Sequence, residues 1–216
     1  MLDWILDRAG EVTEEVHVVT NHRFAADFER WSAGRVTVHD DGTTSNEDRL
    51  GAIGDVRFVL DRIGRDDDLL VIAGDNLFDY SLAEYVAWWR GKGVASAVAL
   101  HEVDDLELVR QYSVVEVDDD DRIVSFVEKP ADPRSGLCAT ATYIYHREHV
   151  PLVDAYPGDP DKSGSLVEWL HERAPVYGYR FEGGWLDIGN REQLLEADNR
   201  LRRRQGMPER AQYAPN

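Results

Sequence analysis

Residues 69–77 read LLVIAGDNL, and this stretch decides how the rest of the chain is interpreted. Leu69–Ala73 is an unbroken apolar run, typical of a strand covered on both faces, as in a parallel sheet. The run stops at Gly74, where the backbone can turn or approach a ligand, and Asp75 and Asn76 follow at once. In open α/β sheets, ligands collect beyond the carboxyl ends of strands, where a carboxylate can hold a hard cation beside a phosphate. Turn chemistry explains the Asp-Asn pair equally well, so a turn and a site remain equal alternatives.

The composition limits the classes of protein that the chain can represent. Its 216 residues suit one α/β domain with a sizeable core. Cys138 is the single cysteine, so an intramolecular disulfide is impossible. No apolar run approaches membrane-spanning length and no charged-then-apolar leader opens the chain, so we expect a cytoplasmic protein without a membrane partner.

The chain is strongly acidic, with a formal net charge of −18 that disfavours nucleic acids and anionic membranes as partners. Its basic residues are nearly all arginines, since only Lys92, Lys129 and Lys162 are lysines, and aspartates form runs at 66–68 and 118–121. An Asp-rich, Lys-poor surface is typical of a halophilic protein, because high salt screens its self-repulsion. An ordinary acidic cytosolic protein is the alternative interpretation.

Strand and helix patterns alternate along the first hundred residues. Apolar periodicity predicts helices at 1–11, 23–32, 51–63, 82–90, 163–173 and 191–204. Short apolar or alternating runs predict strands at 15–20, 35–39, 69–73, 94–100, 112–117, 122–127, 139–145 and 176–181. The pair at 112–127 is a predicted hairpin, which makes the doubly wound α/β sheet a mixed one. We expect one domain over 1–204, followed by a loose polar tail at 205–216.

Three polar clusters stand at predicted strand ends: Asp75 with Asn76, Glu128 with Lys129, and Asp187 inside a glycine-framed loop. Two carboxylates alone cannot enclose a metal, but they suit Mg²⁺, which keeps waters and takes further ligands from phosphates. A lysine such as Lys129 can act as a point charge for a phosphate. An exposed lysine and a solvated glutamate are the simpler interpretations of Lys129 and Glu128. The residues themselves therefore predict an α/β domain with a candidate Mg²⁺–phosphate site, and spacing does not test whether the two aspartates meet.

The order of the motifs resembles the sugar-1-phosphate nucleotidyltransferases, and most of all the glucose-1-phosphate thymidylyltransferase group. The matching segments are VVTNHRF (18–24), DGTTSNEDRLGAIGD (41–55), LLVIAGDNLF (69–78), VSFVEKP (124–130), ATATYIY (139–145) and GGWLDIGNREQLLEADN (183–199). The ordered set GDN, EKP and WLDIGN gives the resemblance its specificity. It implies a Rossmann-like mixed sheet of the nucleotide-diphospho-sugar transferase type.

The resemblance implies that a sugar-1-phosphate oxygen attacks the α-phosphorus of a nucleoside triphosphate and expels pyrophosphate. The expected substrates are dTTP and glucose-1-phosphate, and the expected cofactor is Mg²⁺. By the family pattern, Asp75 and Asp187 would hold the metal, and Lys129 would bind the sugar phosphate. These three residues are the implied catalytic set.

Five further residues are implied to form the substrate site. Glu128 would bind the sugar hydroxyls, with Asn76 beside it in the site. Asn46 and the backbone around Gly51 would lie against the base. Trp185 would help to shape the site beside Asp187, although the alternative that it is a core aromatic is strong.

The sequence departs from the family pattern in two places. Ser113 stands where the family has a glycine whose backbone approaches the sugar, so sugar binding is expected to change. The family also opens with a strand and a glycine-rich phosphate loop that carries two cations, and no such segment is among the 216 residues. We therefore expect a fold that lacks its first strand, an unfilled strand position near Asp75, and Met1–Glu11 packed beside it.

Three interpretations of the function remain open from the sequence. The first is an enzyme that needs an N-terminal extension for turnover. The second is a catalytically dead sugar-nucleotide-binding or regulatory homologue. The third is a scaffold that serves a full-length enzyme, and a homo-oligomer is compatible with each of the three.

Overall fold

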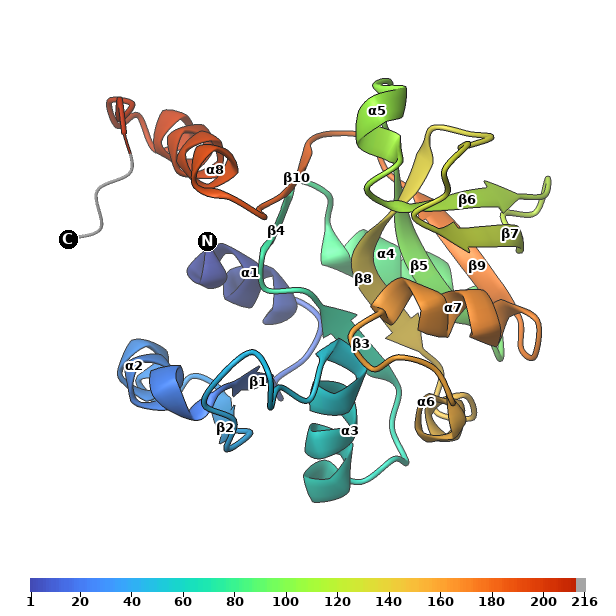
Figure 1. The fold of residues 1–216 in the computed structure, drawn as a ribbon, viewed down its shortest axis with the longest axis horizontal. Helices are drawn as coiled ribbons and strands as arrows, with labels where there is room; N and C mark the ends of the chain where they lie inside the picture. Colours follow the sequence, from blue (N-terminus) through green and yellow to red (C-terminus); the bar gives the residue numbers. More distant parts are fainter. Residues whose placement is uncertain (213–216) are drawn as a thin grey trace.

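The computed structural model describes residues 1–212, which form one α/β fold (Figure 1). The first part of the chain holds α1 (Leu2–Ala9), β1 (His17–Thr20), α2 (His22–Ser32), β2 (Thr37–Asp40), α3 (Ala52–Ile63), β3 (Leu69–Ile72), β4 (Asn76–Phe78) and α4 (Leu82–Arg90). The second part holds β5 (Ser96–Glu102), α5 (Leu106–Val109), β6 (Ser113–Val117), β7 (Ile123–Glu128), β8 (Leu137–Tyr145), α6 (Val150–Ala155), α7 (Ser163–His171), β9 (Val176–Arg180), β10 (Trp185–Asp187) and α8 (Arg191–Arg204). No helix within residues 1–212 combines the length and apolarity needed to cross a bilayer.

The largest sheet is mixed, as the sequence predicted. Its strands run in the order β7-β6-β8-β5-β9, and β3 also pairs with β8. Strand β5 is parallel to β9 and antiparallel to β8, whereas β6 and β7 form the predicted hairpin. Two smaller sheets complete the fold, a parallel pair of β1 with β2 and an antiparallel pair of β4 with β10.

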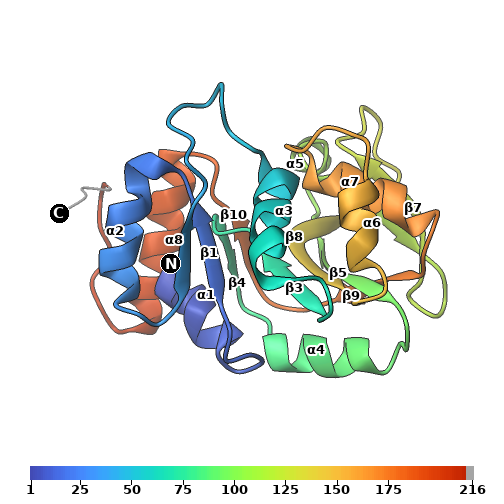
Figure 2. The same cartoon turned by 90° about the horizontal axis from the view of Figure 1, so that it is seen from below.

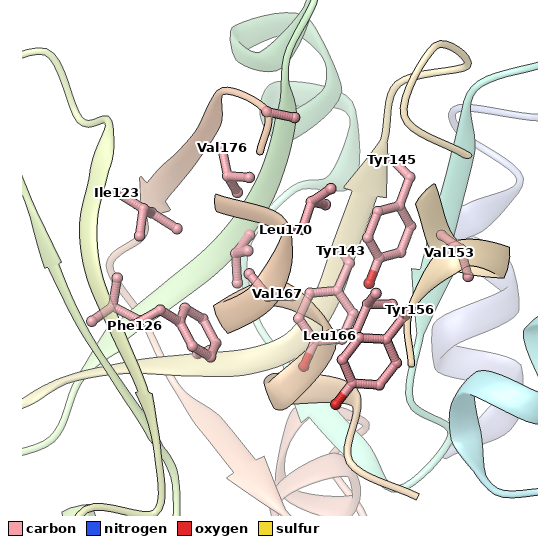
Figure 3. Close-up of a cluster of buried hydrophobic side chains, with 14 of the residues drawn as sticks. Ile123, Phe126, Tyr143, Tyr145, Val153, Tyr156, Leu166, Val167, Leu170 and Val176 are labelled. Atoms are coloured by element: carbon pink, nitrogen blue, oxygen red, sulfur yellow. The ribbon is translucent and has the colours of Figure 1, made fainter. Parts of the chain in front are cut away.

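Helices cover both faces of this sheet, which is the doubly wound arrangement. Val98 and Leu100 of β5 enter a core that is closed by α3, α6 and α7, part of which Figure 3 shows. Ala97 and Ala99 of the same strand enter a second core that is closed by α4. Alternate residues of one strand thus supply two cores, as the pleat requires. The continuous apolar character of β5 follows from this double burial.

Strand β3 corrects one prediction. The apolar run at 69–73 indicated a strand in a parallel neighbourhood, but β3 pairs antiparallel with β8, with Leu69 opposite Tyr145 and Ile72 opposite Thr142. Coverage on both faces produces an apolar run whatever the direction of the neighbouring strand, so the pattern could not fix that direction. All four residues of β3 are only half-buried.

Several strands pair along one edge only among the described residues, and β1 and β3 are two of them. Strand β1 pairs only with β2, and β3 pairs only with β8. Helix α1 lies next to β3, since Leu2 Cδ2 is 3.6 Å from the position that a Cβ on Gly74 would take. Ile5 of α1 packs on the cluster that includes Leu70 and Ile72. Helix α1 therefore lies beside β3 and close to Asp75, as predicted for the first helix.

The elements fall into two groups that Figures 1 and 2 separate clearly. Helices α1, α2 and α8 gather with β1 and β2 on one side, and the large sheet with its helices occupies the other. The short strands β4 and β10 run between the two groups in both views. A site built on these strands therefore lies where the groups meet.

The first residues of the predicted tail lie against α8. Asn199 and Arg210 exchange two hydrogen bonds, in which the Arg210 amide donates to Asn199 Oδ1 over 2.7 Å and Asn199 Nδ2 donates to the Arg210 carbonyl over 2.9 Å. The Met207 amide also donates to the carbonyl of Arg202. Residues 213–216 of the predicted tail lie outside the described residues.

Candidate functional site

Strands β4 and β10 bring two distant segments of the chain together. Their register places Asp187 opposite Asn76, and the Ile188 amide donates to the carbonyl of Asp75 over 3.0 Å. Neither strand was predicted, because three residues are too few to show strand periodicity. Their pairing nevertheless places Asp75 and Asp187 side by side, which sequence spacing could not test.

The side chain of Asn76 links the two aspartates. It is 2% exposed, and its Nδ2 lies 2.8 Å from Asp75 Oδ1 and 3.5 Å from Asp187 Oδ1. Its Oδ1 accepts a hydrogen bond from Trp185 Nε1 over 2.6 Å. An indole nitrogen can only donate, so Trp185 determines which end of the amide faces the carboxylates. The Asn76 amide, expected to contact substrate, is occupied by these three partners.

Asp75 and Asp187, hereafter the carboxylate pair, have the chemistry of a divalent-cation site. Burial raises the pKa of Asp187, repulsion from Asp75 raises it further, and Lys129 acts in the opposite direction. Two adjacent, partly desolvated carboxylates are a donor set whose repulsion a hard cation relieves. Within residues 1–212, no group of three or more His, Cys, Asp and Glu side chains could hold a metal. Two carboxylates would leave most coordination positions of an ion such as Mg²⁺ to phosphates and water.

Lys129 lies on the rim of this site and is exposed. Its amide donates to the carbonyl of Tyr112 over 3.2 Å, and the Tyr112 ring meets Trp185 edge-on with centroids 4.7 Å apart. Lys129 has a φ of 48°, although it precedes Pro130, and such strain is characteristic of functional positions. Burial, and then the charge of Asp187, raises the pKa of Tyr112 to about 12. Tyr112 was missed as a site residue, although it directly precedes the singled-out Ser113.

Glu128 stands at the end of β7, opposite Ser113 at the start of β6. The Ser113 hydroxyl donates to Glu128 Oε2. A Cβ on Gly164, in the first turn of α7, would come within 2.0 Å of the same oxygen. The carboxylate therefore lies between the hairpin and α7.

Asn46 and Gly51 lie away from these contacts. Asn46 is exposed on the loop before α3, and Gly51 is the N-cap residue of that helix with a φ of 78°. A side chain at Gly51 would meet Pro160 and Asp161 at 2.7–2.8 Å, so this loop requires a glycine. No described contact joins Asn46 or Gly51 to the carboxylate pair.

Asp79 is a further residue that the sequence did not reveal. Its carboxylate is 13% exposed and receives hydrogen bonds from Arg200 and from the Gly184 amide, while Arg204 forms an ion pair with it at 2.6 Å. The Arg200 guanidinium occupies the space that a side chain on Gly184 would need. Asp79 thus fastens α8 to the turn before β10, and no local pattern indicates such long-range ion pairs.

A doubly wound sheet with polar side chains gathered beyond its strand ends is the arrangement in which open α/β domains bind their ligands. The sequence profile of the nucleotidyl transferase family matches residues 1–204. The chain therefore belongs to the nucleotidyl transferase family, as the resemblance indicated.

Curated relatives share part of the sequence. A glucose-1-phosphate adenylyltransferase from Thermomicrobium roseum is 32% identical over 141 residues, which are 62% of this chain and 32% of that protein. A second, from Clostridium acetobutylicum, is 25% identical over 60% of this chain and 36% of its own length. The low-salt glycan biosynthesis nucleotidyltransferase Agl11 of Haloferax volcanii is 23% identical over 62% and 38%. The match spans about a third of the length of these relatives.

Solved structures share the fold. A protein described as a glucose-1-phosphate thymidylyltransferase from Bacillus anthracis, in complex with a sucrose, superposes with a TM-score of 0.73 at 19% identity, over 91% of this chain and 80% of that one. An apo UDP-glucose pyrophosphorylase gives the same TM-score at 22% identity, over 94% and 86%. At such identities the likeness is one of architecture.

Proposed function

We propose that this chain is a nucleotidyltransferase domain that joins a nucleoside triphosphate to a sugar-1-phosphate and releases pyrophosphate. The observation that carries the proposal is the carboxylate pair, held by Asn76 beyond the strand ends with Lys129 on the same rim. Membership of the nucleotidyl transferase family supports it. So does its similarity to nucleotidyltransferases from several organisms.

In the proposed reaction, a phosphate oxygen of the sugar-1-phosphate forms a bond to the α-phosphorus as the bond to the β-phosphate oxygen breaks. Pyrophosphate leaves, and no covalent enzyme intermediate is needed. Catalysis then depends on positioning and on neutralising phosphate charge. The carboxylate pair would hold Mg²⁺, which when bound supplies that neutralisation on the triphosphate.

The remaining roles belong to side chains around the pair. Lys129 would bind the sugar phosphate as a point charge. Glu128 would accept hydrogen bonds from sugar hydroxyls, and Trp185 would keep the Asn76 amide aligned. Asn46 and the backbone at Gly51 would contact the base.

The identities of base and sugar are separate proposals. The sequence resemblance favours dTTP and glucose-1-phosphate, whereas two of the relatives above are adenylyltransferases. The assay should therefore offer dTTP, ATP and UTP in parallel, each with glucose-1-phosphate. Preference for one nucleotide by tenfold or more would assign the base.

Isotopically labelled sugar-1-phosphate gives a direct test, since an NDP-sugar forms only if the proposed bond is made. Wild type and Asp187→Asn are compared with Mg²⁺ and with EDTA, and Asp119→Asn is the matched control on an exposed turn. We expect product and pyrophosphate in equal amounts from a chain that carries the complete phosphate-binding segment, and none from Asp187→Asn or with EDTA. An active Asp187→Asn variant would contradict the metal assignment.

A catalytically inactive sugar-nucleotide-binding protein is the second candidate. The observation that favours it is the pair of unpartnered strand edges on β1 and β3. Calorimetry with the three NDP-glucoses separates the candidates. Binding without turnover in every form of the chain would support this second function, whereas turnover would exclude it.

A further inference from the structure

A second polar cluster lies at the base of the β6–β7 hairpin, on the residues next to Tyr112 and Lys129. Ser113 opens β6 and Glu128 ends β7, and the two face each other across the hairpin. The Ser113 side chain is almost fully buried and its hydroxyl donates to Glu128 Oε2. Glu128 itself is only half-buried, so part of its carboxylate remains accessible.

Helix α7 closes the cluster from the other side. A Cβ on Gly164 would overlap Glu128 Oε2 and Ser113 Oγ, so a larger residue there would displace both groups. The next residue back, Ser163, is 3.4 Å from the hydroxyl of Tyr143. Tyr143 is buried beside Leu166 and Val167 (Figure 3), and burial raises its pKa to about 12. The wall around Oε2 is therefore packed and stays uncharged.

The two oxygens of Glu128 consequently differ. Oε2 accepts from Ser113 and is covered by Gly164, whereas no hydrogen bond to Oε1 occurs within the described residues. A carboxylate with both oxygens free can accept from two neighbouring sugar hydroxyls. Here the protein supplies one of those hydroxyls itself, from Ser113.

We propose that Ser113 is a specificity-determining residue that restricts Glu128 to a single hydroxyl of the sugar-1-phosphate, so that the chain tolerates the monodeoxy sugar-1-phosphate that lacks the hydroxyl which Oε2 would otherwise bind. The inference rests on the proposed function. A site that bonds a substrate hydroxyl rejects the analogue lacking it, because a polar group of the site is left unpaired. With Ser113 present, Oε2 stays paired when the substrate lacks that hydroxyl. The discrimination that a free carboxylate would give is thereby lost.

The test measures a ratio of affinities, which a merely structural role would not change. Isothermal calorimetry gives the dissociation constants of glucose-1-phosphate and each of its monodeoxy analogues, with and without nucleotide and Mg²⁺. Ser113→Gly frees Oε2 and also removes bulk, whereas Ser113→Ala removes only the hydroxyl. Ser125→Ala, on the other face of the same hairpin, is the matched control.

We expect wild type and Ser125→Ala to bind glucose-1-phosphate and the best-tolerated analogue within about threefold, as one retained Ser113 bond implies. In Ser113→Gly and Ser113→Ala, the preference for glucose-1-phosphate over that analogue should rise by about tenfold, the effect of one hydrogen bond from a sugar hydroxyl to the charged carboxylate. Ratios unchanged in both variants would overturn the inference. A ratio that changes in Ser113→Gly but not in Ser113→Ala would also overturn it, since the size of the side chain rather than its hydroxyl would then determine the preference.

The same measurements keep this inference apart from the proposed function. A wild-type chain that binds neither sugar phosphate nor nucleotide under any condition would overturn the proposed function, and this inference with it. Binding with an unchanged ratio would overturn only the role of Ser113. Thermal unfolding of each variant checks that the fold is retained, and Glu128→Gln, which keeps the shape of the side chain, should weaken binding of every sugar phosphate that carries the hydroxyl bound by Glu128.

Discussion

The indole N–H of Trp185 donates to Asn76 Oδ1 over 2.6 Å, and this hydrogen bond orients the amide that joins Asp75 to Asp187. The amide donors face the two carboxylates only because the carbonyl oxygen is occupied on the other side. The two aspartates are thus positioned by a chain of neutral groups before any cation is bound. Trp185, interpreted from sequence as a shaping residue or a core aromatic, acts here through its nitrogen.

Trp185→Phe should weaken metal binding while leaving the fold in place. The phenyl ring keeps most of the packing but cannot donate, so the Asn76 amide is free to turn. Loss of a group that orients metal ligands typically costs about 10- to 100-fold in affinity, and we expect a change of that size for Mn²⁺, followed by electron paramagnetic resonance. Trp31→Phe, which also loses an indole hydrogen bond but on α2, should bind as wild type does. Equal Mn²⁺ affinities in all three proteins would contradict the role given to Trp185.

Asp75→Asn should raise stability and lower metal affinity together. The substitution removes the negative charge that, after burial, raises the pKa of Asp187, so the folded state should gain stability. A neutral amide is a poor ligand for Mg²⁺, so metal-dependent stabilisation and turnover should be lost. Thermal unfolding with and without Mg²⁺ measures both effects. A variant that is less stable than wild type without metal would show that the two carboxylates do not repel each other.

Local chemistry explains which parts of the fold could be predicted from the sequence. The starts of α2, α4 and α8 were predicted correctly, because Asn21, Ser81 and Asn190 each accept a hydrogen bond from a backbone amide three residues further on. Both partners of such a cap lie within three residues of each other, so a short stretch of sequence is enough to predict it. The same holds for the hairpin at β6 and β7.

The site depends on contacts that no short segment contains. Strands β4 and β10 have three residues each, and they pair only once the segments around residues 76–78 and 185–187 are brought together by the fold. The bond from Trp185 to Asn76 and the ion pairs of Asp79 join residues more than a hundred positions apart. Family resemblance named Asp75, Asp187 and Lys129 as candidates. Only the folded structure shows that Asn76 contacts both aspartates and that Trp185 orients its amide.

Asp55→Asn should stabilise the protein above pH 6. Burial first, and then Asp41 and Asp161, raise the pKa of Asp55 to about 6 from an ordinary value of 3.8. The folded state therefore keeps a proton that the unfolded chain has lost, and the free energy of unfolding falls as pH rises from about 4 to 6. The full shift corresponds to ~3 kcal/mol, and screening of this partly exposed group reduces the expected gain to about 1 kcal/mol.

Urea unfolding between pH 4 and pH 8 checks this prediction. The difference between Asp55→Asn and wild type should be near zero at pH 4 and reach its full value above pH 6. Asp119→Asn removes one charge from an exposed turn and controls for the general acidity of the chain. A difference that does not vary with pH would show that Asp55 ionises normally.

Stability should rise with salt if the acidic surface is a high-salt adaptation. The chain carries 42 acidic residues against 24 basic ones, and at 1 M salt the screening length falls to about 3 Å. Screening weakens surface ion pairs as well, such as that of Arg65 with Asp61, so a rise requires repulsion to dominate. Thermal unfolding from low to molar KCl, with sucrose as an uncharged control, measures the balance. A melting temperature that is constant or falls with KCl would exclude the adaptation.

The unpartnered edges of β1 and β3 predict rapid exchange of their amides. Half of the backbone groups of an edge strand point away from its partner and meet solvent instead. We expect the outward-facing amides of β3 to exchange at least 100-fold faster than those of β5, which pairs on both sides. Amide exchange followed by NMR measures this directly. Equal protection in β3 and β5 would mean that another segment covers the open edge.

The same edges lead to the last prediction, which concerns turnover. A strand that paired in parallel with β3 would end beside Asp75, where β3 itself ends. Amides and cations at that point would stabilise the departing pyrophosphate, and loss of one such donor costs ~3 kcal/mol or more in the transition state. We therefore expect the 216 residues alone to release no pyrophosphate from dTTP or ATP. A form lengthened upstream by a strand and a glycine-rich loop should release it with Mg²⁺ and glucose-1-phosphate, and should also lose the rapid exchange of the β3 amides. Robust turnover by the 216 residues alone would refute this account of catalysis, whereas a lengthened form that protects β3 but stays inactive would favour the sugar-nucleotide-binding function.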